Sequence, residues 1–146
     1  MRLITAMLAD DAFVANNGKL YIHGGAWSRL HTPVFPTTHP KMAVVLVLEV
    51  EYGEALKIHD LEVVLVRDGE PLGPRAQGQL NVGHAPGTQL GAPAQVPIAL
   101  PFPMLTFDSP GRYEWDVLVD GTSLGQVDME IVPVKLPPGI VGPTVG

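Results

Sequence analysis

The segment Pro110-Gly111-Arg112-Tyr113-Glu114-Trp115-Asp116-Val117-Leu118-Val119-Asp120-Gly121 decides the fold class. Between its Pro-Gly and Asp-Gly turn signals, apolar and charged side chains alternate with the two-residue period of a half-buried strand. The apolar face carries Tyr113, Trp115, Val117 and Val119, and the same alternation resumes from Gln126 to Ile131. This pattern predicts an antiparallel hairpin, the repeating unit of a β-sandwich.

Further strands are expected on the N-terminal side of this hairpin. Alternating or apolar runs between turn signals predict strands at 3–8, 19–23, 42–51, 61–67, 77–82 and 95–100. Gly24-Gly25 indicates a bulge or a bend, and Pro97 places the last of these strands at a sheet edge. The proline-rich stretch 32–40 is expected to cross between two sheets. Together these signals predict an all-β, immunoglobulin-like antiparallel β-sandwich of about seven to nine strands.

The length of 146 residues suits a single domain with its own core. We expect the sandwich to span residues 1–135. Residues 136–146 form an apolar tail, rich in Pro and Gly, that carries no charged side chain. This tail is expected to be extended, because Pro and Gly interrupt regular structure throughout it.

Composition narrows the possible partners and the compartment. The chain has no cysteine, so disulfides and thiolate metal sites are excluded, and a reducing, cytoplasmic location is the expectation. The net charge of −6 disfavours nucleic acid, whose phosphates would repel the chain. The apolar run at 3–9 is too short to span a membrane. We therefore expect neither a nucleic acid nor a membrane as partner.

No motif in the sequence indicates a catalytic or metal site. The five histidines, His23, His31, His39, His59 and His84, lack the close spacing of metal ligands. The neighbouring Asp10 and Asp11 follow the first predicted strand, where capping or a turn explains them best. Ser28 and Ser109 do not lie in a nucleophile elbow. The chain is therefore expected to be non-enzymatic, without a metal or cofactor.

Two predicted strands carry apolar side chains on both faces. The outer face of a sheet in a small sandwich is normally polar, so these outward apolar residues are unusual. Val45 and Val47 lie opposite the core-facing residues of one strand, and Val64 and Val66 do so on the next. Their cover could come from the chain's own loops and tail, or from a second subunit or protein partner. The predicted interface comprises these four valines with Leu136, Pro137, Ile140 and Val141 of the tail.

The order of several short motifs resembles a bacterial family of small β-rich proteins known only as a domain of unknown function. The matching residues are Leu8-Ala9-Asp10-Asp11-Ala12, then Gly18-Lys19-Leu20-Tyr21-Ile22 with Gly24-Gly25 and Trp27, and finally Pro110 to Trp115 with Asp120-Gly121. The resemblance implies a bacterial origin and is compatible with a sandwich. It implies no activity, and the apolar tail departs from the family pattern.

Two functions remain open from the sequence. The leading hypothesis is a non-enzymatic protein-binding or assembly module that acts through the outer valines and the tail. The partner would be another protein or a second copy of the chain. The alternative is a small-ligand or carbohydrate-binding module that uses loops at the end of the sandwich, near Trp27 and at 83–93.

Overall fold

Nine β-strands and no helix make up residues 1–135, the part of the chain that the computed structural model describes. The strands are β1 (Arg2–Val14), β2 (Leu20–Trp27), β3 (Arg29–Thr32), β4 (Thr37–Val50), β5 (Ile58–Arg67), β6 (Glu70–Asn81), β7 (Ala94–Phe107), β8 (Gly111–Val119) and β9 (Thr122–Pro133). The prediction of an all-β protein is confirmed. Within these residues no helix is long and apolar enough to cross a membrane.

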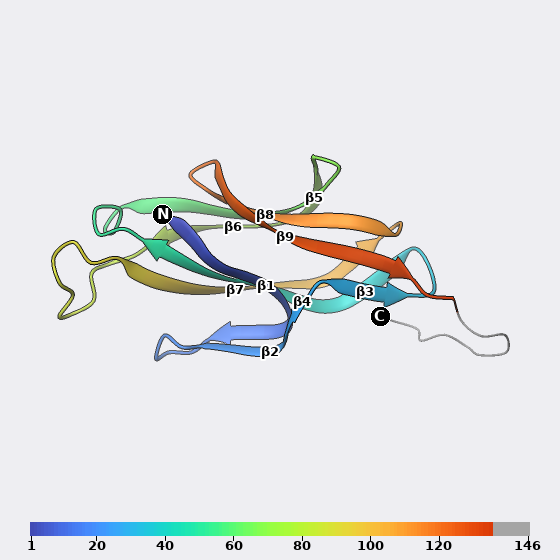
Figure 1. The fold of residues 1–146 in the computed structure, drawn as a ribbon, viewed down its shortest axis with the longest axis horizontal. Helices are drawn as coiled ribbons and strands as arrows, with labels where there is room; N and C mark the ends of the chain where they lie inside the picture. Colours follow the sequence, from blue (N-terminus) through green and yellow to red (C-terminus); the bar gives the residue numbers. More distant parts are fainter. Residues whose placement is uncertain (136–146) are drawn as a thin grey trace.

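The strands form two sheets that face each other across one core (Figure 1). The first sheet has the order β2-β1-β4-β7, and the second has the order β3-β9-β8-β5-β6. Neighbouring strands are antiparallel except β3 and β9, which are parallel. The chain crosses from the second sheet to the first between β3 and β4, inside the stretch expected to make that crossing.

The hairpin predicted from the deciding segment is formed by β8 and β9. Asp120 and Gly121 make its turn with φ of 50° and 80°, a left-handed conformation that Asp tolerates and Gly adopts freely. Trp115 is fully buried, and its ring lies 4.4 Å from that of Phe102 on the opposite sheet. The alternation of apolar and charged residues in this segment therefore places the apolar side chains in the core, as predicted.

The connection from β7 to β8 is fixed by one buried tyrosine. The Tyr113 hydroxyl donates to the carbonyl oxygen of Ser109 at 2.7 Å. Arg67 donates from Nη1 to that hydroxyl at 2.7 Å and from Nη2 to the carbonyl of Pro110 at 2.8 Å. The guanidinium carbon lies 4.7 Å from the centre of the Tyr113 ring, so a cation–π contact adds to these hydrogen bonds.

The edge position predicted from Pro97 is confirmed, because β7 is the outer strand of the first sheet. The strand continues beyond the predicted range, through Pro101 and Pro103 to Phe107. An edge strand tolerates these prolines because proline removes an amide that would have no ladder partner there.

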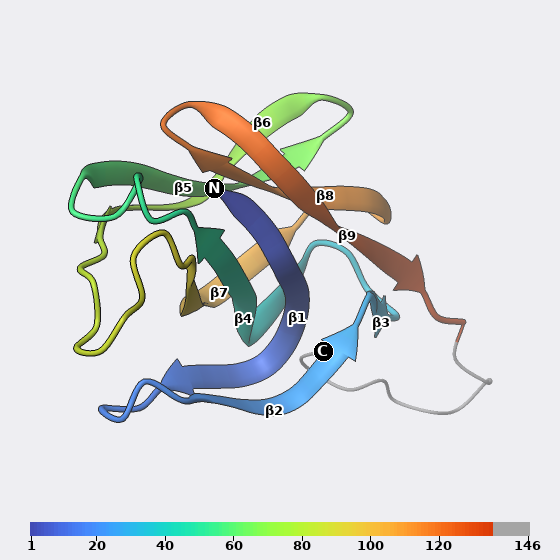
Figure 2. The same cartoon turned by 60° about the vertical axis from the view of Figure 1, so that its left-hand side comes forward.

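The first strand is longer than predicted, and the expectation of a turn at Asp10 and Asp11 is wrong. Both residues lie inside β1. The first half of β1 pairs with β4 and the second half with β2, so the strand continues where the prediction ended it. Figure 2 shows β1 bending as it passes from one partner to the other, which gives the first sheet its curled shape.

Candidate binding surface on the β1–β2 hairpin

The β1–β2 hairpin is closed by a turn at Asn17-Gly18, residue types that tolerate the backbone conformations of tight turns. Gly18 has a φ of 82°, and its amide donates to Ala15 O at 2.9 Å. The amide of Lys19 donates to the Asn17 side chain at 3.0 Å, an Asx turn that fixes the loop. The ladder then begins with the Ala15 amide, which donates to Lys19 O at 2.9 Å. The hairpin extends from the curled end of the first sheet (Figure 2).

Four large apolar side chains of this hairpin are exposed, Phe13 and Tyr21 on one face and Val14 and Ile22 on the other. We call these four residues the hairpin surface, and its centre is the face that carries Phe13 and Tyr21. Phe13 and Tyr21 are directly opposite each other, and their rings stack at 5.1 Å with an interplanar angle of 10°. They are 49% and 43% exposed. Large aromatic side chains that remain in water are typical of binding surfaces, because burying them yields much free energy.

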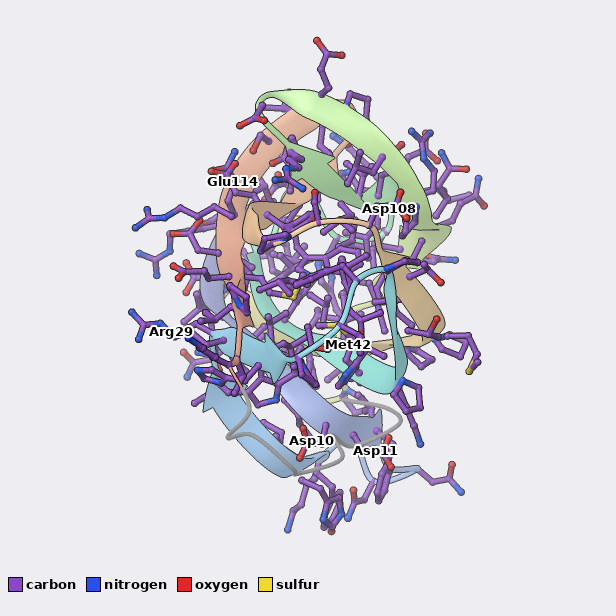
Figure 3. The ribbon with its side chains drawn as sticks, turned by 90° about the vertical axis from the view of Figure 1, so that its right-hand side faces the viewer. Asp10, Asp11, Arg29, Met42, Asp108 and Glu114 are labelled. Carbon is purple, nitrogen blue, oxygen red and sulfur yellow. The ribbon has the colours of Figure 1, made fainter. Side chains whose placement is uncertain are left out.

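Charged groups border the aromatic pair on the same hairpin. Asp11 pairs with His23 across the ladder, and its carboxylate lies 3.2 Å from the Lys41 ammonium. The Lys41 hydrogen bond lowers the pKa of Asp11. Asp10 lies beside Gly24, where a Cβ would collide with its carboxylate. Asp10 and Asp11 lie at the same end of the molecule (Figure 3).

The predicted interface of outer valines is corrected by the structure in two respects. Val45 and Val47 belong to β4 in the first sheet, whereas Val64 and Val66 belong to β5 in the second. The connection from β4 to β5 crosses between the sheets, so the two pairs lie on opposite outer faces and cannot form one surface.

Burial is the second correction, because two of these valines are covered within the single chain. Val45 has no exposed area and packs in a small cluster of Ala9, Ala12, Ala43, Met7, Leu20 and Ala99. Val64 is 5% exposed, with Arg75 and Asp116 opposite it on the neighbouring strands. Val47 and Val66 are half-buried. The curled first sheet buries Val45, and long polar side chains of the second sheet cover Val64.

The remaining predicted interface residues, Leu136, Pro137, Ile140 and Val141, lie outside the described residues.

A pocket of about 440 Å³ lies at the end of the sheets where the alternative hypothesis expected one. The loops at 51–57 and 82–93 supply most of its lining, including Tyr52, Ala55, His84, Thr88 and Pro93. The Tyr52 and His84 rings stack at 3.9 Å, and His84 Nε2 lies 3.1 Å from Tyr52 O. Trp27 does not line this pocket; it packs against the main core from β2.

A smaller groove of about 260 Å³ crosses β3, β8 and β9 on the outer face of the second sheet. Arg29, Arg112, Glu114, Asp128 and Glu130 line it, so both signs of charge are present. Arg29 and Glu114 lie on the same side of the molecule in Figure 3. The ion pair between Arg112 and Glu130 is long, at 3.9 Å, and exposed, which makes it weak.

His59 is buried, and both of its ring nitrogens are engaged in joining loops. Nδ1 lies 2.7 Å from Asp120 Oδ2, and Nε2 lies 2.8 Å from Glu54 O. The carboxylate of Asp120 raises the pKa of His59, and the histidine in turn lowers the pKa of Asp120. Because both ring nitrogens of His59 are engaged by acceptors within the protein, neither is free to bind a ligand. The role of His59 is therefore structural.

The sequence does not indicate the hairpin surface, because β1 continues past the point where the predicted strand ends. Phe13 and Val14 follow Asp10 and Asp11, which lie beyond the predicted end of the first strand. Tyr21 and Ile22 read as half-buried residues of an ordinary strand. Only the pairing of Phe13 with Tyr21 across the Asn17-Gly18 turn could have indicated that two aromatics meet there.

Comparison with known proteins places the chain in a family without a known activity. No match to a curated protein is found. Among solved structures, the chain is similar to the Pseudomonas fluorescens alkylpurine DNA glycosylase AlkC bound to DNA containing an abasic site analog. The identity is 15%, the TM-score is 0.46, and the match covers 87% of this chain but 30% of that one. The family model that matches residues 4–132 is the family of unknown function DUF6941, and the chain belongs to that family.

Proposed function

We propose that the protein is a non-enzymatic protein-binding or assembly module of the cytoplasm that acts through the hairpin surface. The observation that carries this proposal is the stacked pair of Phe13 and Tyr21, which is nearly half exposed on the β1–β2 hairpin. Aromatic side chains that are already held in place lose little conformational entropy on binding, and they dominate the energy of many interfaces. The hairpin replaces the outer valines as the proposed site.

An immunoglobulin-like sandwich is the proposed finer description of the fold. The strands β1, β4 and β7 face β9, β8 and β5, an arrangement typical of the two sheets of that fold. Tyr113 stands near the start of β8, and its hydroxyl bonds back to Ser109, as in a tyrosine corner. Many proteins of this architecture act by contact, so the fold is compatible with a binding role.

Site-specific photo-crosslinking in cells tests this function. A photoreactive phenylalanine analogue at position 13 is expected to form covalent adducts with protein. The matched control carries the same analogue at Met104, which is 67% exposed on β7 and lies outside the hairpin surface. An absence of adducts at position 13, or equal yields at both positions, would contradict the proposal.

The pocket beside Tyr52 and His84 supports a second candidate function, the binding of a small ligand. Its volume lies in the range of known ligand sites, and its walls are mostly apolar with a few polar groups. No Asp, Glu, Lys or Arg is among its lining residues, so an uncharged ligand such as a sugar or a heterocycle fits best. A thermal-shift screen tests this candidate: a specific ligand raises Tm in the wild type and fails to do so in His84→Ala. A panel of such ligands without any shift would eliminate it.

A further inference from the structure

Sheet edges are where strands can add to one another, because their outward amides and carbonyls lack ladder partners. In the part of the chain that the structure describes, three of the four edges are protected. The edge strand β7 contains three prolines, β6 contains two, and β3 has only four residues. The fourth edge strand, β2, contains neither proline nor any Asp, Glu, Lys or Arg, and its residues from Tyr21 to Ala26 are exposed.

Part of β2 is open to pairing, and the ladder defines which groups point outward. Because Ala15 donates to Lys19 O, Lys19 faces β1, and the alternation of an antiparallel ladder turns the amides of Leu20 and Ile22 away from β1. Gly24 and Ala26 then have φ of 59° and 63°, so regular strand geometry ends there. The open edge is therefore short and centred on Leu20 to Ile22.

We propose that this edge pairs with the same edge of a second copy of the chain, in an antiparallel dimer that joins two first sheets. This inference rests on the proposed function, since it names the partner of the hairpin surface. Because the other described edges are protected, the β2 edge of one copy can pair only with the β2 edge of another. This pairing uses the open edge of both copies, so the assembly stops at a dimer. The absence of charged side chains between Leu20 and Trp27 means that no like charges meet across the join.

The hydrogen-bonding pattern fixes the register of this dimer. Outward-facing residues must meet outward-facing residues, so Leu20 of one copy pairs with Ile22 of the other, and the two Tyr21 residues meet on the two-fold axis. A register shifted toward Gly24 would place its left-handed backbone in the ladder, and one shifted toward Gly18 would use the turn. The chosen register also extends the stack of Phe13 on Tyr21 into a row of four rings.

Light scattering coupled to size exclusion tests the dimer with purified full-length protein. The wild type is expected to approach twice 15.6 kDa as its concentration is raised. Ile22→Lys, which places a charge at the open edge, is expected to weaken the dimer at least tenfold. Met104→Lys, which adds the same charge to the protected edge of the same sheet, is expected to leave it unchanged.

A cysteine crosslink tests the register, since the natural chain has no cysteine. Tyr21→Cys is expected to form a disulfide-linked dimer under mild oxidation, because residues facing each other across an antiparallel pair lie within disulfide reach. Met104→Cys is expected to form no disulfide-linked dimer, because position 104 on β7 lies away from the proposed contact.

Three results would overturn the inference. These are a wild-type monomer up to about 1 mM, open-ended oligomers in place of a dimer, or equal crosslinking of both cysteine variants. If the wild type is a monomer while position 13 still crosslinks to another protein in cells, the second copy is wrong and the proposed function stands. If neither experiment detects association, both are wrong.

Discussion

Tyr113 and Arg67 join three parts of the fold, because the Tyr113 hydroxyl, near the start of β8, hydrogen-bonds both the Ser109 carbonyl and the Arg67 guanidinium. Replacing Tyr113 with Phe keeps the ring but leaves Ser109 O and the arginine without this partner. We expect Tyr113→Phe to lower the free energy of unfolding by about 1–3 kcal/mol in urea titrations. The matched change Tyr21→Phe on the exposed hairpin should cost less than about 0.5 kcal/mol. Equal effects of the two changes would mean that the corner hydroxyl is not structural.

His59 gives the stability of the protein a dependence on pH whose sign follows from its raised pKa. The folded state holds the imidazolium against Asp120, so its contribution is fully present below the ordinary histidine pKa of about 6.5 and is lost as pH rises through the folded value. At the acid end, the contribution of Asp120 disappears as pH falls through that residue's lowered pKa.

The variant His59→Gln should therefore be most destabilised, relative to the wild type, in the mildly acidic range between these two limits. The measurement is the difference in the free energy of unfolding between the two proteins across pH. A difference that grows as pH rises through neutrality would contradict the assignment.

At the scale of elements, the pairing of β1 with β2 depends on one close approach, between Gly24 and Asp10. Gly24 has a φ of 59°, and a Cβ there would strike the Asp10 carboxylate. We expect Gly24→Ala to destabilise the protein by about 2–3 kcal/mol, from backbone strain plus the collision. Gly18→Ala, at a φ of 82° with open space around it, should cost only the strain, about 1–2 kcal/mol.

Placing Gly24→Ala in an Asp10→Ala background should reduce its cost to that of Gly18→Ala, as measured by chemical denaturation. An undiminished cost would mean that the carboxylate is not the obstacle.

Most elements could be predicted from the sequence because they are regular. The β8–β9 hairpin and the edge position of Pro97 follow from local alternation and turn chemistry, and the left-handed φ of Asp120 and Gly121 agrees with the turn. Membership in a family of unknown function was also predicted correctly.

The site could not be predicted, since it depends on which sheet each strand joins. Val45 and Val64 have similar sequence surroundings, but a crossing between them sends their strands to opposite sheets. The exposure of Phe13 likewise depends on β1 changing partners at Leu8 and Ala9, which periodicity does not encode.

At the scale of the whole molecule, charge opposes association while the hairpin favours it. Each copy carries a net charge of −6, and the proposed contact consists of backbone hydrogen bonds and apolar side chains. Added salt screens the repulsion between copies without weakening that contact. We expect the dimer dissociation constant, measured by sedimentation, to fall several-fold from about 0.01 M to 0.5 M salt. A dimer that dissociates as salt is added would indicate an interface built from ion pairs instead.

The most direct measurement of the central claim is amide hydrogen exchange of β2 as a function of protein concentration. The outward amides of Leu20 and Ile22 should exchange quickly in dilute protein and become protected as copies associate, while outward amides of β7 exchange at the same rate throughout. Exchange of Leu20 and Ile22 that stays fast in concentrated protein would contradict the assignment of β2 as the binding edge.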